Sequence, residues 1–416
     1  MSDRPSHDTT HALEALLRRY LAAWGGSILR GAGGAAHEEI HLVYVVGFAA
    51  AAGPAGEAPE LSALHSSLQV LDTLGASGVR KGKVRTNAVL VEEDPVQAAR
   101  LIASLGSAGL SARVCETRDL EQLAPGGIAV LAAGFDEVSG ELLRYTAPPR
   151  RALYVLDPPA PRLLPLQAMR PLVQQAGGDL VIRFPTAELH KQARFRGSAV
   201  ADLPPYAKRI VEGYSLLFGD ARYEWLSLWR AAEKEGGAEG AAVAEARMLE
   251  HYRTRLTEID AEVAVRWVPL AAPGADAGTH YLFLAMRDPE RALLMNRVLH
   301  AARLAGEVAW GDALSGFVRV EESGVIDLFG QEEIGVDPSA AAPHSRTREV
   351  NLTALAHEIA TTFAGQTVLF REVLMELVDT DLFVEEIKRA LSLLKRDGRA
   401  DYASLNADAE ITFATK

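Results

Sequence analysis

The hydrophobic positions of this chain form short continuous runs that alternate with longer amphipathic segments. The clearest runs, rich in Val, Leu and Ile, lie at 41–48, 86–94, 152–160 and 179–185, with shorter ones at 111–116 and 127–135. Such runs are typical of strands buried on both faces of a parallel sheet. The segment PVQAARLIASLGSAG after the second run starts with proline and ends on glycine, as helices do. The alternation predicts a doubly wound α/β sheet.

The pattern changes after the last of these runs. From about 199 to 258 it is helical and contains several aromatic residues, so we expect a helical insertion. Two apolar runs then follow, at 262–272 and 279–288, and the Gly-rich turn between them predicts a hairpin. A hairpin that closes a parallel sheet in this way indicates a Rossmann-like sheet of the class I methyltransferase type.

A polar, proline-containing stretch at 323–349 predicts a linker between two domains, 1–322 and 350–416. In the second domain, three helical patterns precede two short strands, RADYAS and EITFAT, around the turn LNADA. This order predicts a C-terminal winged helix. Its third helix and the residue after it carry a group of cations: Lys388, Arg389, Lys395, Arg396 and Arg399.

Composition narrows the function classes. A chain of 416 residues is too long for one compact core. Its formal net charge of −12 argues against nucleic-acid binding by the whole surface, although a local basic face stays open. The single cysteine, Cys115, excludes an internal disulfide and a cysteine-built zinc site, and the HEIA segment at His357 lacks the second histidine of a zinc-protease helix. With no signal-peptide pattern and no long apolar run, we expect a cytoplasmic protein without metal.

Six segments, in order, resemble those of the three-Cys-motif partner proteins, the TcmP family. They are YVVGFAAAAG, LVEEDPVQAARL, YVLDPPAPRLLPLQAMRPLV, LVIRFPTAELHKQA, HYLFLAMRDPERALLMNRVL and the C-terminal stretch from TTFAGQTVLFREVL to IKRALSLLKRDGRADY. The resemblance covers most of the chain. It implies a methyltransferase-like domain, S-adenosylmethionine as the cofactor, and a partner protein that bears a three-cysteine motif.

The resemblance also has gaps at the first turn, where the family has Tyr-x-Asp-Gly-Phe-Ala-Gly-x-Gly. Val46 stands in place of the acid, and alanines fill 50–52. A second family acid, in Gly-Asp-Phe after the third strand, is replaced by Gly134. Either the cofactor pocket is modified, or the fold has lost its ligand. The cofactor-binding candidates are Gly47, Phe48, Gly53, Glu92, Glu93 and Phe135.

Two carboxylate positions carry the chemistry. Glu92 and Glu93 end the second strand, where an acid in Rossmann-like sheets accepts hydrogen bonds from ribose hydroxyls. Asp157, followed by Pro158 and Pro159, resembles the Asp/Asn-Pro-Pro motif of amino-methyltransferases. There the acid would orient a target amine while proline rigidity fixes the geometry. The alternative is a rigid turn that leaves the sheet. Because Ala160 follows, no aromatic residue is present to stack a flipped base.

Three functions therefore stay open. The first is methyl transfer from S-adenosylmethionine to an amine, including one on nucleic acid. The second is a catalytically inactive scaffold, and the third is a DNA-binding regulator led by the winged helix. Arg183 and His190 belong to a charged group at and after the end of the 179–185 run. This group indicates either a phosphate or partner site or a solvated helix face.

Overall fold

The computed structural model describes residues 7–31, 39–49, 61–76, 84–115, 119–187, 189–190, 200–220, 222–270, 280–309, 316–323 and 345–415. The chain divides into two compact units. The first comprises Met1–Leu270 and Asp276–Arg287, and the second comprises Ala271–Ala275 and Asp288–Lys416. None of the helices in the described ranges is long and apolar enough to cross a membrane.

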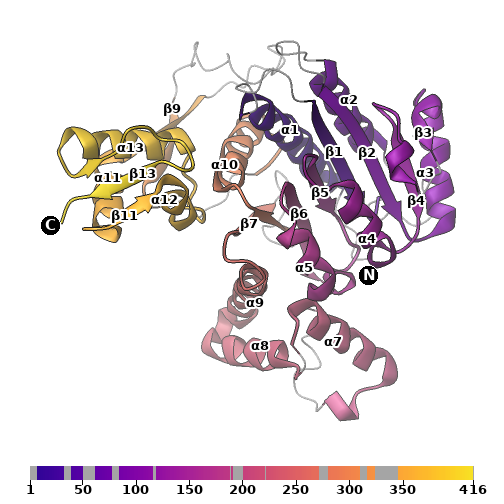
Figure 1. Cartoon of the computed structure of the whole chain (residues 1–416). Helices are drawn as coiled ribbons and strands as arrows, with labels where there is room; N and C mark the ends of the chain where they lie inside the picture. Colours follow the sequence, from indigo (N-terminus) through magenta and orange to yellow (C-terminus); the bar gives the residue numbers. More distant parts are fainter. Residues whose placement is uncertain are drawn as a thin grey trace. The chain divides into compact units, whose positions relative to one another are not determined.

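The first unit is built on an eight-stranded sheet with the order β3-β4-β2-β1-β5-β6-β8-β7 (Figure 1). β8 is antiparallel to β6 and β7, and the other neighbours are parallel. The doubly wound parallel sheet and its closing hairpin are therefore confirmed. The strands are β1 (Ile40–Gly47), β2 (Val84–Glu92), β3 (Val114–Cys115), β4 (Ile128–Ala132), β5 (Arg151–Leu156), β6 (Gly178–Pro185), β7 (Ala264–Leu270) and β8 (His280–Met286).

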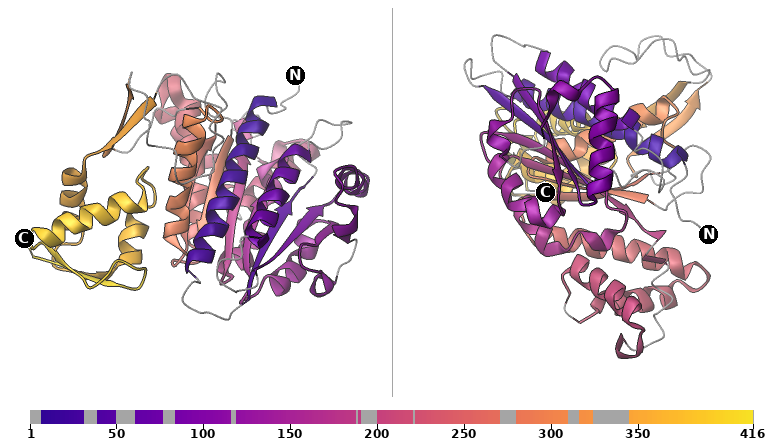
Figure 2. Two further views of the ribbon diagram at one scale, coloured as in Figure 1. Left: turned by 90° about the horizontal axis from the view of Figure 1, so that it is seen from above. Right: turned by 90° about the vertical axis from the view of Figure 1, so that its right-hand side faces the viewer.

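Helices cover both faces of this sheet because alternate strand residues point to opposite sides. On one face, α1 (His7–Gly31) and α2 (Leu61–Ala76) lie side by side (Figure 2, left), and α3 (Pro95–Ser107) lies next to α2. Trp24 of α1 donates its Nε1 hydrogen to the Asp179 carboxylate, 2.8 Å away. On the other face, α4 (Phe135–Tyr145) and α5 (Leu166–Gln174) contribute to a large apolar core.

Between β6 and β7 the described residues include the helices α7 (Pro205–Phe218), α8 (Glu224–Glu235) and α9 (Gly240–Thr257). α7 and α9 lie beside α5 (Figure 1), and together with α8 they bury a group of large side chains that includes Trp225, Trp229 and Tyr252. These three aromatic residues therefore pack as core. Short 3-10 turns complete the unit: η2 (Ser111–Arg113), η3 (Leu120–Gln122), η4 (Pro161–Leu163), η6 (Val200–Asp202) and η7 (Gly237–Glu239).

The second unit begins before the segment predicted as a linker. It contains α10 (Pro289–Leu304), β9 (Val318–Ser323), β10 (Ser345–Val350), α11 (Leu352–Thr362), β11 (Thr367–Leu369), α12 (Phe370–Glu376), α13 (Val384–Arg396), β12 (Ala400–Asp401) and β13 (Glu410–Phe413). β9 and β10 form an antiparallel pair, and the last three strands form a sheet in the order β11-β13-β12. The predicted linker lies mostly outside the described residues, and its described end forms β10.

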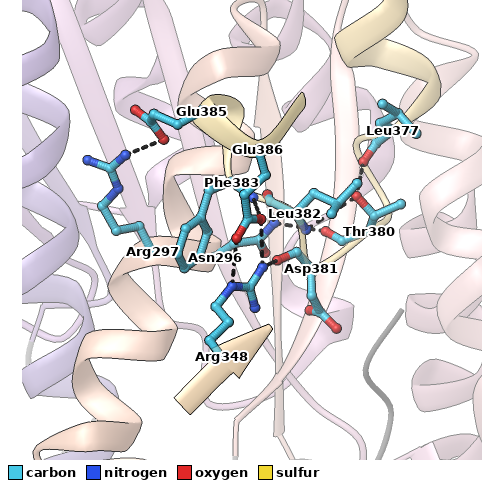
Figure 3. Close-up of polar contacts among 10 residues, drawn as sticks. All are labelled: Asn296, Arg297, Arg348, Leu377, Thr380, Asp381, Leu382, Phe383, Glu385 and Glu386. Atoms are coloured by element: carbon cyan, nitrogen blue, oxygen red, sulfur yellow. Dashed lines mark hydrogen bonds and ion pairs between the residues drawn. The ribbon is translucent and has the colours of Figure 1, made fainter. Parts of the chain in front are cut away.

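Two polar side chains join the early and late parts of this unit (Figure 3). Asn296 of α10 donates through Nδ2 to the carbonyl oxygens of Thr380 and Leu382, both at 2.8 Å. Arg348 of β10 binds both carboxylate oxygens of Glu386, at 2.9 and 2.8 Å. The Arg348 guanidinium also lies 4.0 Å from the Phe383 ring centroid. These contacts hold α10 and β10 to the turn between α12 and α13.

Candidate functional site

The two carboxylates expected at the rim of the sheet flank the end of β1. Gly47, the last residue of β1, pairs with Val91 of β2 on one side and with Leu156 of β5 on the other. Glu92 and Asp157 are the next residues of those strands, so they stand at the same level and on the same face. With neighbouring strands ~4.8 Å apart, their Cα atoms are separated by roughly 10 Å. The strand register therefore brings both candidates to one edge.

Glu92 and Glu93, which the sequence could not separate, have different environments. Glu92 is buried, and its Oε1 accepts a hydrogen bond from the backbone N–H of Asp94 at 3.1 Å. Glu93 is exposed. Asp94 caps α3 by accepting from the Val96 N–H at 2.8 Å, so its carboxylate has a local structural role. Glu92 is thus the carboxylate that β2 delivers to the face shared with Asp157.

The end of β1 is tightly packed. A Cβ on Gly47 would lie 2.7 Å from Leu156 Cδ2 and 3.0 Å from Phe135 Cδ2. Phe48 has a positive φ of 63°, and its ring stacks on Phe135 at a centroid distance of 6.3 Å. Phe135, a cofactor-binding candidate, is therefore part of the core beside this turn. Gly53 and the alanines at 50–52 lie outside the described residues.

Asp157 is half of an ion pair. Its Oδ1 accepts from Nε of Arg183, the residue next to it on β6, and both side chains are largely buried. Arg183 Nη1 lies 3.5 Å from Nδ1 of His280 on β8. Burial, and then the charge of Arg183, lower the pKa of His280 to about 4. The carboxylate of Asp157 thus lies between the end of β1 and a buried guanidinium.

Tyr44 lies on the same face of β1. The pKa of its phenol is raised to about 12, mainly by burial. A hydrogen bond with Ser67 of α2 lowers this pKa, and the charge of Asp157 raises it. Because that pKa is far above neutrality, the phenol stays protonated. It is a buried neutral polar group, four residues before the level of Glu92 and Asp157 along the strands.

A second polar cluster lies on the opposite face of the same edge. His190, which follows β6, binds the Glu245 carboxylate through Nε2. Glu245 Oε1 accepts the Tyr281 hydroxyl at 2.6 Å. The His190 ring meets Trp229 edge-on at 5.2 Å. The other members of the charged group predicted after the 179–185 run lie outside the described residues. They are Glu188, Lys191, Arg194 and Arg196.

Sequence reasoning did not find the partners Glu245, His280 and Tyr281. The position of Glu245 could have been predicted from the sequence, because it lies on the same helix face as the buried residues of α9: Met248, Leu249, Tyr252 and Leu256. A charged residue on an apolar helix face needs a partner. The roles of His280 and Tyr281 depend on the antiparallel register of β6 and β8, which pairs Phe184 with Tyr281.

In the second unit, three of the five predicted basic residues contact acids. Lys388 pairs with Glu290, Lys395 with Asp401, and Arg396 with Asp397, at 3.3, 3.3 and 3.2 Å. Lys395 also lies 4.5 Å from the ring centroid of Tyr402. Arg389 is exposed and Arg399 half-buried. The helix that carries these cations begins with Glu385 and Glu386.

The described residues contain no cluster of His, Cys, Asp and Glu that could hold a metal ion. Cys115 is a half-buried free thiol on the short edge strand β3.

Comparison with known proteins leaves the family open. No protein-family model matches the chain, and no curated protein matches it. One similar solved structure is that of "a putative sarcosine dimethylglycine methyltransferase from Galdieria sulphuraria", with 11% sequence identity, 64% of this chain and 84% of that chain covered, and a TM-score of 0.23. At that TM-score the similarity adds nothing to the strand order and the edge residues. The resemblance to the TcmP family stays a prediction from sequence motifs.

Proposed function

We propose that the first unit binds S-adenosylmethionine at the carboxyl edge of its sheet and transfers the methyl group to an amine. The observation that carries this proposal is the placement of Glu92 and Asp157 at one level on either side of the end of β1. Ligands of open α/β sheets bind outside the carboxyl ends of the strands, where the strand order reverses. The reversal here lies at β1, between β2 and β5.

The described residues fit the nucleoside part of this cofactor. Glu92 presents a carboxylate at the end of β2, where it would accept hydrogen bonds from the ribose hydroxyls. Phe48 holds a left-handed backbone conformation that costs of order 1–3 kcal/mol, and such strain gathers at ligand sites. When bound, the sulfonium of the cofactor would supply the methyl group.

Asp157 would orient the acceptor amine. Its contact with Arg183 uses Oδ1, and Oδ2 would accept the amine hydrogen. Pro158 fixes the direction in which the chain leaves the strand, which supports this geometry. The Arg183 guanidinium donates to Oδ1, so the carboxylate acts here as a hydrogen-bond acceptor.

Calorimetry with S-adenosylmethionine and S-adenosylhomocysteine tests the cofactor. We expect binding that Glu92→Ala weakens and that the matched control Glu93→Ala, at the exposed neighbour, changes less. Loss of a charge-assisted hydrogen bond pair predicts a weakening of about 10-fold or more. No heat at millimolar ligand would remove the enzyme proposal.

Turnover tests the acceptor role. With a single-stranded DNA oligonucleotide as the amine probe and a labelled methyl donor, Asp157→Ala should abolish transfer and preserve S-adenosylhomocysteine affinity. Because Asp157 also pairs with Arg183, the melting temperature of this variant is measured beside its activity. Equal loss of folding and turnover would indicate a structural role alone.

Two observations favour a catalytically inactive scaffold instead. Val46 cannot replace the missing acid, and the carboxylate of Asp157 is already neutralised by Arg183. On this alternative, Asp157 and Arg183 only hold β5 to β6. The calorimetric experiment separates the two functions, since a scaffold of this kind would bind neither ligand.

For the second unit we propose a winged helix that binds a protein, with a three-Cys-motif protein as the partner, in the cytoplasm. Its order of helices and strands fits a winged helix, with β11 as the third strand of the wing sheet. The support for a protein partner is that Lys388, Lys395 and Arg396 contact acids. A duplex-DNA titration should therefore show weak binding, and neutralising Arg389 and Arg399 should barely change its salt slope. A steep slope that Arg389→Ala reduces would favour the DNA-binding regulator.

A further inference from the structure

The hydrogen-bonded chain of His190, Glu245 and Tyr281 joins three separate elements. His190 follows β6, Glu245 lies on α9 of the helical insertion, and Tyr281 lies on β8. Glu245 is 9% exposed, while the side chain of His190 is 35% exposed. A buried carboxylate is costly unless it is paired and hydrogen-bonded, and the two contacts of Glu245 offset that cost.

This arrangement fixes the tautomer of His190. An ionised carboxylate only accepts hydrogen bonds, so the imidazole nitrogen that contacts Glu245, Nε2, must carry the hydrogen. The lone pair of the neutral ring then lies on Nδ1. Tyr281 donates its hydroxyl to the other oxygen, and that bond fixes the orientation of the carboxylate. Burial, followed by the Glu245 contact, raises the pKa of Tyr281, so its phenol keeps its hydrogen at neutral pH.

The cluster belongs to the same edge as Asp157. Tyr281 and His280 are neighbours on β8 and point to opposite faces of the sheet. His280 approaches Arg183, which in turn binds Asp157. The two clusters therefore lie on opposite faces of the sheet near the start of β8, at the carboxyl ends of the parallel strands.

We propose that His190 is the general base for the acceptor, with Glu245 and Tyr281 as its positioning residues. This inference rests on the proposed methyl transfer and extends it to an acceptor that must lose a proton, an N–H or an O–H nucleophile. As the acceptor reacts, its bond to hydrogen breaks and the electron pair stays on the acceptor. A new N–H bond forms at Nδ1 of His190. The resulting imidazolium is stabilised by the adjacent Glu245 carboxylate.

The tautomer is tested without any ligand. The full chain is labelled with ¹⁵N-histidine and measured by long-range nitrogen–proton NMR. The signals of His190 are those that disappear in His190→Asn, and they should show that the hydrogen is on Nε2. Glu245→Gln, which keeps the side-chain shape, should redistribute the two tautomers. His357, exposed on α11, is the internal control whose signals stay unchanged. A hydrogen on Nδ1 in the unaltered protein, or a tautomer that Glu245→Gln does not move, overturns the proposal.

Its location is tested by chemical modification. Diethyl pyrocarbonate should modify both His190 and His357, as followed by mass spectrometry of peptides. Saturating S-adenosylhomocysteine should slow modification of His190 and leave His357 unchanged. If calorimetry shows that S-adenosylhomocysteine binds and His190 is not protected, then His190 lies away from the cofactor site and the proposal is wrong.

Turnover on the oligonucleotide probe completes the test. His190→Asn should lower transfer by about 10²- to 10⁴-fold and preserve S-adenosylhomocysteine affinity. Glu245→Gln should lower it less and shift its pH profile, which a merely structural role would not do. Failure of cofactor binding with the expected tautomer intact defeats methyl transfer, and with it the role of His190 as its base, but leaves the positioning of His190 by Glu245 standing. Unchanged turnover in His190→Asn defeats the base while methyl transfer stands.

Discussion

At the scale of single residues, the site depends on the absence of a side chain at Gly47. A methyl group there would meet Leu156 Cδ2 at 2.7 Å and Phe135 Cδ2 at 3.0 Å. Overpacking of this kind costs ~1–3 kcal/mol, because Leu156 and Phe135 are themselves held by the core. We therefore expect Gly47→Ala to lower the free energy of unfolding by that amount in urea titrations.

Gly140 on α4 is the matched control, because a Cβ there would meet nothing within 4 Å. An alanine in an exposed helix position stabilises by up to ~1 kcal/mol over glycine. The two Gly→Ala substitutions should therefore change stability in opposite directions. A stable Gly47→Ala protein would mean that Phe135 moves easily, and with it the space beside the end of β1.

His280 predicts how stability changes with pH. Its pKa is lowered to about 4, first by burial and then by Arg183. The unfolded chain takes up this proton near pH 6.5, so the stabilising contribution is complete above that pH and is lost as the pH falls toward 4. The single group then accounts for about 2 kcal/mol of lost stability between pH 7 and pH 5.

The measurement is urea unfolding of the full chain at both pH values, followed by tryptophan fluorescence. His280→Gln should reduce the loss, because glutamine does not titrate. The exposed His357→Gln is the control and should leave it unchanged. An equal loss in the His280→Gln protein would show that His280 is not the group responsible.

At the scale of elements, Asp157 and Arg183 link β5 to β6 across one register position. Breaking a largely buried pair from one side leaves an uncompensated charge, which costs about 3–5 kcal/mol. We expect Arg183→Met to destabilise the protein by that much. The double variant Asp157→Asn, Arg183→Met should recover most of the loss, because neither side chain is then charged. A double-mutant cycle by thermal unfolding with no coupling between the two sites would contradict the ion pair.

The strands were predictable from sequence because their apolar runs are long and continuous. Glu92 and Asp157 could be placed at one edge for the same reason, since parallel strands end together. The antiparallel register of β8 could not be predicted, so neither the contact of Arg183 with Asp157 nor that of Tyr281 with Glu245 could be expected from the sequence. Those contacts depend on the register of β8, because alternate side chains of a strand face opposite sides of the sheet. Tertiary packing sets that register.

At the scale of the whole molecule, the division into units differs from the linker that the composition of 323–349 indicates. The predicted linker at 323–349 places α10 in the first domain, 1–322. The contacts of α10 assign it to the second unit. Leu293 of α10 packs in the core formed by α11, α12 and α13, and Asn296 binds the turn before α13. The sequence pattern therefore places α10 in the first domain, whereas its side-chain packing places it in the second unit.

Two fragments test this division. The fragment 288–416 retains Asn296 and Arg348, while 350–416 lacks both. Without them, the carbonyls of Thr380 and Leu382 and the carboxylate of Glu386 lose the partners that Figure 3 shows. Loss of the buried Arg348–Glu386 pair alone costs about 3–5 kcal/mol. We expect 288–416 to unfold cooperatively in circular dichroism melts, and 350–416 to melt at a much lower temperature or not to fold.

Arg348→Met within 288–416 isolates the contribution of the ion pair. It should destabilise strongly, and Glu386→Gln added to it should recover part of the loss. Arg297→Met, which removes a partly exposed contact with Glu385, is the control and should cost no more than about 1 kcal/mol. If 350–416 instead melts like 288–416, then α10 and β10 add nothing to the C-terminal helices. The domain would then begin where the sequence pattern placed it, and the Asn296 and Arg348 contacts would be peripheral.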